Sequence, residues 1–174
     1  MKVYIVRHGQ TVANDLKIHN SKDEELTMLG IKQGKELGEK LLNIDFDIII
    51  SSPLKRAINT ANLINRRSIP IIYDERLQER KNGNLVGKPL ELEDRNEYWN
   101  YDSIVQYGTS EDIKTFFKRI FNFLNELKEK DYSSVLIVAH AGVSRAFSCY
   151  FDGIQDGKFA NRGLKNCEIK EYEF

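Results

Sequence analysis

Four short apolar runs divide the chain into segments with a different, helical spacing of apolar residues. Each run has apolar side chains at consecutive positions, so both of its faces are apolar. Such runs are typical of strands buried between two layers of helices in a parallel sheet. We therefore predict strands at residues 2–6, 48–50, 71–73 and 135–139.

The segments between these runs have the three- and four-residue spacing of amphipathic helices. Thr27 is a candidate N-cap for a helix in which Gly34 and Gly38 permit close approach of another backbone. Two more helices are predicted at residues 54–64 and 113–127, and the second has the cleanest periodicity.

Strands that alternate with helices predict βαβ units. The expected fold class is an α/β three-layer sandwich, in which a mostly parallel sheet is flanked by helices. Residues 167–174 alternate loosely and are compatible with an added edge strand. Because 174 residues is the length of one compact domain, we expect residues 1–174 to form a single domain.

Residues 80–109 are the one irregular stretch of the sequence. They include glycines and the aromatic residues Tyr98, Trp99, Tyr101 and Tyr107. Structureless loops of this length are uncommon in compact domains and are often functional. Two interpretations stay open: a partly helical lid over a pocket, or a surface excursion whose aromatic residues pack on the body of the domain.

Charge and composition restrict the classes of partner and the compartment. Basic and acidic residues number 26 each and the pI is near 6.8, so neither nucleic acid nor a membrane surface is an expected partner. No apolar run approaches the ~20 residues of a membrane span, and the first one is too short for a signal peptide. Cys149 and Cys167 have no metal-binding or redox spacing, so we expect reduced thiols in a cytoplasmic protein, with a single disulfide as the alternative.

Cationic and histidine side chains follow three of the predicted strands. Arg7 and His8 follow the first strand, Arg56 lies just after the second, and His140 follows the fourth. Because ligands of parallel α/β sheets bind beyond the carboxyl ends of the strands, these side chains are expected to meet at one edge. An arginine fork binds two phosphate oxygens, and a neutral imidazole is a nucleophile toward phosphorus. The combination predicts a phosphate site.

Each of these residues taken alone has a structural explanation. An Arg–His pair and a histidine at a strand end are often buried for packing, and an arginine on a helix is often solvated. The functional interpretation depends on the three groups of side chains occurring together. Their positive charges repel one another, and a shared bound anion would offset this repulsion. His19 is different: it lies in a polar loop and is predicted to be a surface histidine.

Five motifs surround these residues, at positions 6–11 with Asn14, 25–30, 51–57, 77–80 and 139–142. In this combination and order, the chain resembles the histidine phosphatase superfamily, the phosphoglycerate-mutase-like group, over about residues 2–150. The resemblance implies that His8 is the nucleophile and forms a phosphohistidine. It also implies that Arg7, Arg56 and His140 bind the phosphoryl oxygens.

The resemblance assigns the remaining roles as well. Glu79 would protonate the leaving oxygen and then deprotonate the attacking water, with an ion pair to a neighbouring arginine as the structural alternative. Thr11 and Asn14 would contact phosphate or substrate, and the backbone N–H of Ala141 would be available to it. The neighbouring arginines should keep His8 neutral. Neither a metal ion nor another cofactor is expected.

The expected function is metal-independent hydrolysis of a small phosphorylated substrate. One alternative is phosphoglycerate mutase, but mutases of this group carry longer insertions, for which this chain has little room. The other is a catalytically silent phospho-ligand-binding protein, against which the full set of presumed catalytic residues argues. Departures from the family pattern at residues 83–88 and 108–111 prevent the transfer of a specificity, and the sequence carries no signal for an oligomeric state.

Overall fold

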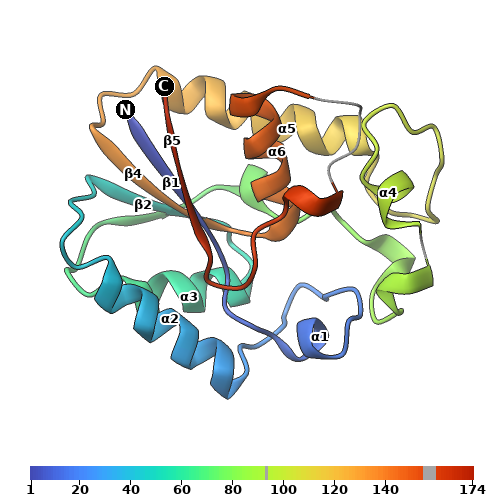
Figure 1. Ribbon diagram of the computed structural model, residues 1–174, viewed down its shortest axis with the longest axis horizontal. Helices are drawn as coiled ribbons and strands as arrows, with labels where there is room; N and C mark the ends of the chain where they lie inside the picture. Colours follow the sequence, from blue (N-terminus) through green and yellow to red (C-terminus); the bar gives the residue numbers. More distant parts are fainter. Residues whose placement is uncertain (93, 155–159) are drawn as a thin grey trace.

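The computed structural model describes residues 1–92, 94–154 and 160–174. Its centre is a five-stranded sheet of order β3-β2-β4-β1-β5 (Figure 1). The strands are β1 (Lys2–Arg7), β2 (Ile48–Ser51), β3 (Ile71–Tyr73), β4 (Ser134–Ala139) and β5 (Ile169–Glu173). Neighbours among β1 to β4 are parallel, and β5 is antiparallel to β1 at one edge. The four predicted strands and the edge strand are thus confirmed.

Helices cover both faces of the sheet (Figure 1). One face is covered by α2 (Met28–Lys40) and α3 (Lys55–Ile64), and the other by α5 (Ile113–Lys128) and α6 (Ala141–Asp152). In β1, Val3 and Ile5 belong to the apolar cluster with α5 and α6, whereas Tyr4 and Val6 belong to the cluster with α2 and α3. Because both faces are covered, the strand is apolar at every interior position, and the predicted three-layer α/β sandwich is confirmed.

Local sequence signals account for the start of two helices. The Thr27 hydroxyl accepts a hydrogen bond from the N–H of Gly30 at 3.0 Å, and Asp112 accepts one from the N–H of Thr115 at 2.9 Å. The predicted close approach at Gly38 is to α3, since a Cβ there would lie 3.0 Å from the Leu63 carbonyl oxygen. Within the described ranges, no helix is both long enough and apolar enough to cross a membrane.

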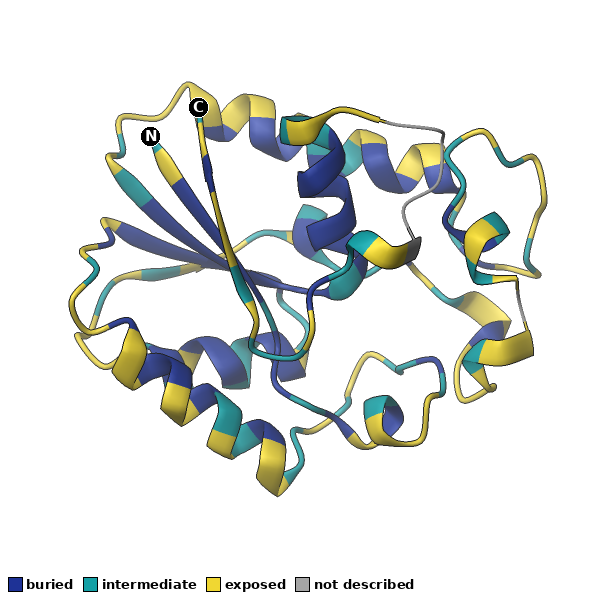
Figure 2. Ribbon diagram, viewed as in Figure 1, coloured by how far each residue is buried: buried dark blue, intermediate teal, exposed yellow. Residues whose placement is uncertain are grey.

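Helix α6 was not predicted from the sequence pattern. Residues 142–149 are all buried, as the dark-blue helix in Figure 2 shows. It packs against β1, α5 and the short helix η4 (Ala160–Arg162). Ser144, Ser148 and Asp152 recur every four residues along α6, but the helix is buried on every side over residues 142–149. Its polar positions therefore do not mark a solvent-facing side, as they do in a surface helix.

The described part of the irregular stretch contains only short helices, which are η2 (Gly83–Leu85), η3 (Leu90–Leu92) and α4 (Arg95–Tyr98). Another short helix, η1 (Glu75–Leu77), precedes it. Tyr98 and Trp99 are buried, and the Trp99 ring meets Phe116 of α5 edge to face at 6.0 Å. The stretch is therefore partly helical, and its aromatic residues pack on the body of the domain. Movement of the stretch as a lid stays a prediction.

Candidate active site

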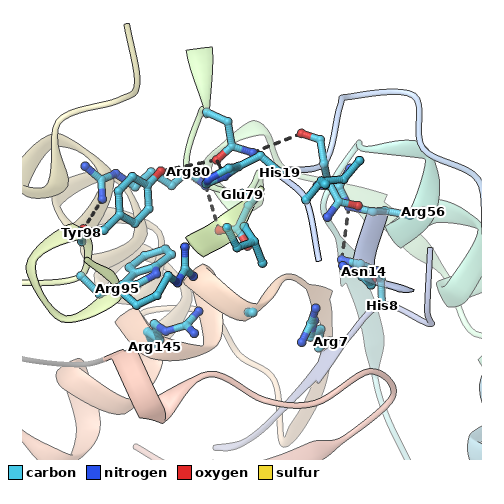
Figure 3. A pocket seen from close by; sticks show the side chains of 16 residues that line it. Arg7, His8, Asn14, His19, Arg56, Glu79, Arg80, Arg95, Tyr98 and Arg145 are labelled. Carbon is cyan, nitrogen blue, oxygen red and sulfur yellow. Dashed lines mark hydrogen bonds between the residues drawn. The ribbon is translucent and has the colours of Figure 1, made fainter. Parts of the chain in front are cut away.

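The carboxyl ends of three neighbouring strands lie level with one another. Arg7 at the end of β1 pairs with Ala139 of β4, whose Val138 pairs with Ser51 of β2. A cavity of about 200 Å³ opens there (Figure 3). The predicted meeting of Arg7, His8 and Arg56 is borne out, because all three side chains line this cavity.

His8 is held in a defined tautomer at the cavity. Its Nδ1 lies 2.8 Å from the carbonyl oxygen of Gly9, which only accepts, so Nδ1 must carry the proton. Its Nε2 therefore has a lone pair, and it accepts a hydrogen bond from Nε of Arg56 at 3.2 Å. Burial, followed by the charges of Arg56 and Arg7, lowers the pKa of His8 well below 6.5. The side chain presents a neutral, nucleophilic nitrogen.

His140 lies behind His8 and is fully buried. The two rings meet edge to face with centroids 5.1 Å apart, and Nε2 of His140 lies 2.8 Å from the Ser52 hydroxyl. Its Nδ1 has no partner in the part of the chain that the structure describes. Burial and the charge of Arg56 lower the pKa of His140 well below 6.5, so this ring too is neutral. His140 is not among the residues that line the cavity, and its contact with the phosphoryl oxygens stays a prediction.

Arg7 and Arg56, the two arginines beside His8, are positively charged and largely shielded from solvent. Arg56 is 2% exposed, donates from Nη1 to the Ser21 carbonyl at 2.8 Å, and has a pKa lowered by burial to about 10. Arg7 donates from Nη1 to the Leu164 carbonyl at 2.9 Å, and burial lowers its pKa as well. Among the described residues, neither forms a salt bridge, and the buried Nε of Arg7 has no partner. Such a pair favours an anion between them.

Glu79 is held on the cavity wall by two backbone amides. Oε1 accepts from the N–H of Arg80 at 2.9 Å, and Oε2 accepts from the N–H of Gly142 in the first turn of α6 at 3.0 Å. A Cβ at Gly142 would lie 2.0 Å from Oε1 of Glu79. The carboxylate can take this position only because residue 142 is glycine.

The other predicted contacts divide into two groups. Asn14 and Ala141 line the cavity. Thr11 is fully buried and does not, because its hydroxyl donates to Asn20 at 2.7 Å and accepts from the N–H of Asn14 at 3.2 Å. Thr11 is thus the N-cap of the short helix α1 (Val12–Asp15), and the expected phosphate contact is not retained.

The expectation for His19 was wrong. This residue is 3% exposed and lines the cavity, and its Nδ1 lies 3.1 Å from the Asn82 side-chain oxygen. Its backbone N–H donates to Lys88, and its carbonyl accepts from Gly87. The irregular stretch therefore covers the polar loop, a contact between segments about seventy positions apart that local composition does not report.

Sequence reasoning also missed three arginines of the cavity wall, Arg80, Arg95 and Arg145. Arg80 donates to the carbonyls of Glu111 and Tyr98. Arg145 lies on the buried helix α6, with its guanidinium carbon 4.4 Å from the centroid of the Trp99 ring. The sequence did contain one indication of Arg145: it is the only charged residue in the largely apolar segment 141–151. Charged side chains are rarely buried without a structural or functional role.

No group of three or more His, Cys, Asp or Glu side chains that could hold a metal ion occurs among residues 1–92, 94–154 and 160–174. The positive charge at the cavity comes from guanidinium groups.

Comparisons with known proteins agree with this arrangement. The family model of the histidine phosphatase superfamily (branch 1) matches residues 3–174. A provisionally named phosphoserine phosphatase 2 of Hydrogenobacter thermophilus is 34% identical, over 98% of this chain and 88% of its own. A 2,3-bisphosphoglycerate-dependent phosphoglycerate mutase of Cytophaga hutchinsonii is 32% identical, over 98% and 86%. The crystal structure of the α-ribazole phosphatase of Shigella flexneri superposes with a TM-score of 0.85 at 27% identity, over 98% and 89%.

Proposed function

Since the chain belongs to the histidine phosphatase superfamily, we propose that it hydrolyses small phosphomonoesters through a phosphohistidine on His8. One observation carries the proposal: the Nε2 lone pair of a neutral His8, beside the Arg56 guanidinium, at a cavity with an excess of arginine. Phosphate esters are anions, and this combination supplies both a nucleophile and the charge that holds them.

In the first step, Nε2 of His8 attacks phosphorus and the P–O ester bond breaks. Arg7 and Arg56 stabilise the negative charge on the phosphoryl oxygens, and His140 orients the His8 ring from behind. Glu79 gives its proton to the leaving alcohol oxygen. In the second step, Glu79 takes a proton from water, the water oxygen attacks phosphorus, and the P–N bond breaks to release phosphate.

The proposal includes three further points from the sequence. Residues 1–174 act as one catalytic domain, the stretch 80–109 covers its cavity, and the enzyme works in the cytoplasm without a metal ion. The free thiols of Cys149 and Cys167 are consistent with a reducing compartment. Fractionation of cells and activity in excess EDTA test the last point.

The central experiment measures phosphate release from p-nitrophenyl phosphate and a panel of sugar phosphates, phosphoglycerates and nucleotides. We expect turnover in EDTA, loss of nearly all of it in His8→Ala, and an acid-labile phosphate on His8 of the quenched enzyme. Phosphate on His140, or a fully active His8→Ala variant, would sink the assignment. Isomerisation of 3-phosphoglycerate with negligible phosphate release would favour the mutase.

A further inference from the structure

The loop of residues 164–168 lies at the same edge of the sheet as the cavity, although it comes from the far end of the chain. It leads into β5, which is antiparallel to β1, so it lies beside the carboxyl end of β1, where Arg7 and His8 are. Two backbone hydrogen bonds fix this position. The N–H of Cys167 donates to the Arg7 carbonyl at 2.9 Å, and the N–H of Arg7 donates to the Glu168 carbonyl at 3.3 Å. The loop is thereby held against the residues of the proposed chemistry.

Within this loop, the side chain of Asn166 donates from Nδ2 to two acceptors next to the cavity. These are the carbonyl oxygen of His8 at 2.9 Å and Oδ1 of Asn14 at 3.0 Å. A backbone carbonyl can only accept, so the atom of Asn166 that faces His8 must be the nitrogen. An amide nitrogen carries two hydrogens, and these two bonds use both of them.

The amide of Asn14 receives two hydrogen bonds on the same atom. Its Oδ1 accepts from the backbone N–H of Thr11 at 3.1 Å and from Nδ2 of Asn166 at 3.0 Å. Because a backbone N–H can only donate, the atom of Asn14 that faces Thr11 must be the oxygen. Asn14 lines the cavity (Figure 3), and its Nδ2 donates to no residue that the structure describes. The NH₂ group is therefore the part of this amide that can donate to an oxygen of a phosphoryl group in the cavity.

The bond from Asn166 restricts the rotation of this amide. The terminal torsion of an asparagine side chain is broad and roughly two-fold, so a single hydrogen bond leaves the amide considerable freedom. An Asn14 amide that rotated by half a turn would present its oxygen to the phosphoryl oxygens, and these groups repel one another. Two donors on Oδ1, from Thr11 and Asn166, hold the amide in the orientation that presents the NH₂ group instead.

We propose that Asn166 is a positioning residue for phosphoryl transfer, which holds the amide of Asn14 with its NH₂ group toward the phosphoryl oxygens. Asn166 is not among the residues that line the cavity, so it acts through Asn14. This inference rests on the proposed phosphatase function and adds to it a residue behind the cavity wall.

The test is a double-mutant cycle on Asn14 and Asn166 with two readouts. One is the Kd of inorganic phosphate, measured by calorimetry, and the other is kcat/KM on p-nitrophenyl phosphate. Asn14→Ala should weaken phosphate binding and lower kcat/KM by about 10- to 100-fold, the range for a hydrogen bond to a charged group. Asn166→Ala should cost about tenfold in each. The double variant should lose no more than Asn14→Ala, because an amide that has been removed cannot be positioned.

Two further variants separate positioning from a general loss of stability. Asn65→Ala is the matched control, since Asn65 forms two hydrogen bonds with the backbone of Ile69, at 2.8 and 2.9 Å, and is not among the residues that line the cavity. It should lower the midpoint of thermal unfolding and leave phosphate binding and kcat/KM unchanged. Asn166→Asp keeps the size of the side chain but places oxygen against two acceptors, so it should lose at least as much as Asn166→Ala. If Asn166→Ala does not fold, Asn166→Asp takes its place in the cycle.

Several outcomes would overturn the inference. Losses that multiply in the double variant would mean that Asn166 acts by a route other than Asn14, such as the backbone of His8. Wild-type phosphate binding in Asn166→Ala or Asn166→Asp, with only the thermal midpoint lowered, would make the residue purely structural. In both cases the wild type still hydrolyses p-nitrophenyl phosphate through His8 and only the inference fails, whereas no hydrolysis by the wild type refutes the proposed function.

Discussion

Replacing Gly142 by alanine should separate proton donation from the other steps of catalysis. The N–H of Gly142 donates to Oε2 of Glu79 at 3.0 Å, and an added Cβ would lie 2.0 Å from Oε1 and 2.7 Å from a ring carbon of Trp99. Moving the carboxylate relieves the first contact, and the Trp99 ring, which packs on Phe116, must also shift to relieve the second. Residue 142 is helical, so alanine introduces no backbone strain there.

The size of the effect follows from this displacement. To reach ordinary contact at 3.4 Å from a starting 2.0 Å, Oε1 must shift by about 1.4 Å. A misplacement of about 1 Å at a catalytic group costs on the order of 10²-fold in rate, within the ~10²–10⁴-fold range of general acid catalysis. Alanine also improves helix propensity by roughly 0.5–1 kcal/mol, which offsets part of the cost of moving the carboxylate and the Trp99 ring.

The assay measures kcat/KM, which covers the steps up to phosphorylation of His8, on an alkyl phosphate and on p-nitrophenyl phosphate. Alkoxide is a poor leaving group and needs the proton, so about 10²-fold is expected there and much less on the nitrophenyl ester. Gly34→Ala is the matched control, because it makes the same change in α2, away from the cavity. Equal losses on both substrates, or full activity, would refute the placement of Glu79 as the acid.

Three further predictions concern stability. His8 and His140 are buried and neutral, with pKa values well below 6.5, so below pH 6.5 the unfolded chain takes up protons that the folded chain does not. The free energy of unfolding should therefore fall as the pH falls, by up to ~1.4 kcal/mol per pH unit for each histidine. Urea unfolding at pH 7 and pH 5.5 measures this, and a flat profile contradicts it. Inorganic phosphate should relieve the repulsion between Arg7 and Arg56 and so raise the midpoint of thermal unfolding. At 100 times its Kd, phosphate should add ~2.7 kcal/mol to the free energy of unfolding, and Arg56→Met should remove this gain. Phe116→Ala should lower the free energy of unfolding, measured in urea, by ~3–5 kcal/mol, since Phe116 is fully buried beneath Trp99. A loss below ~1 kcal/mol would mean that the stretch 80–109 does not depend on that contact.

The sheet and the cluster of Arg7, His8 and Arg56 could be predicted because the sequence patterns that indicate them are local. The run Val3–Val6 is apolar at every position because both faces of β1 are covered, and Arg7 and His8 follow it directly. The carboxyl ends of parallel strands meet at one edge in any such fold, so the meeting of Arg7, His8 and Arg56 required no knowledge of the packing.

The rest of the cavity depends on contacts that local patterns do not report. His19 occurs in a polar loop, yet the backbone of Gly87 and Lys88 covers it, and its burial results from that distant pairing. Arg145 belongs to a helix that is buried on every side over residues 142–149, so its polar positions do not mark a solvent-facing side and identified neither the helix nor the residue. Thr11 shows the opposite case: a helix cap and a phosphate contact use the same residue type, and only the bond from its hydroxyl to Asn20 distinguishes them.

The segment 140–142 connects His8 and Glu79, the residues to which we assign the nucleophile and the acid. His140 packs against the ring of His8, and two residues later the N–H of Gly142 holds Glu79. The parallel register of β4 with β1 places the start of this segment beside His8, and the first turn of α6 directs the amide of Gly142 at the carboxylate. Glu79 follows η1, a single turn that gives it little rigidity of its own. Arg119 of α5 holds the backbone of this segment by donating to the carbonyls of Gln78 and Glu79 at 2.8 and 3.1 Å, and Gly142 of α6 holds the carboxylate. Both helices therefore set the distance between Glu79 and His8.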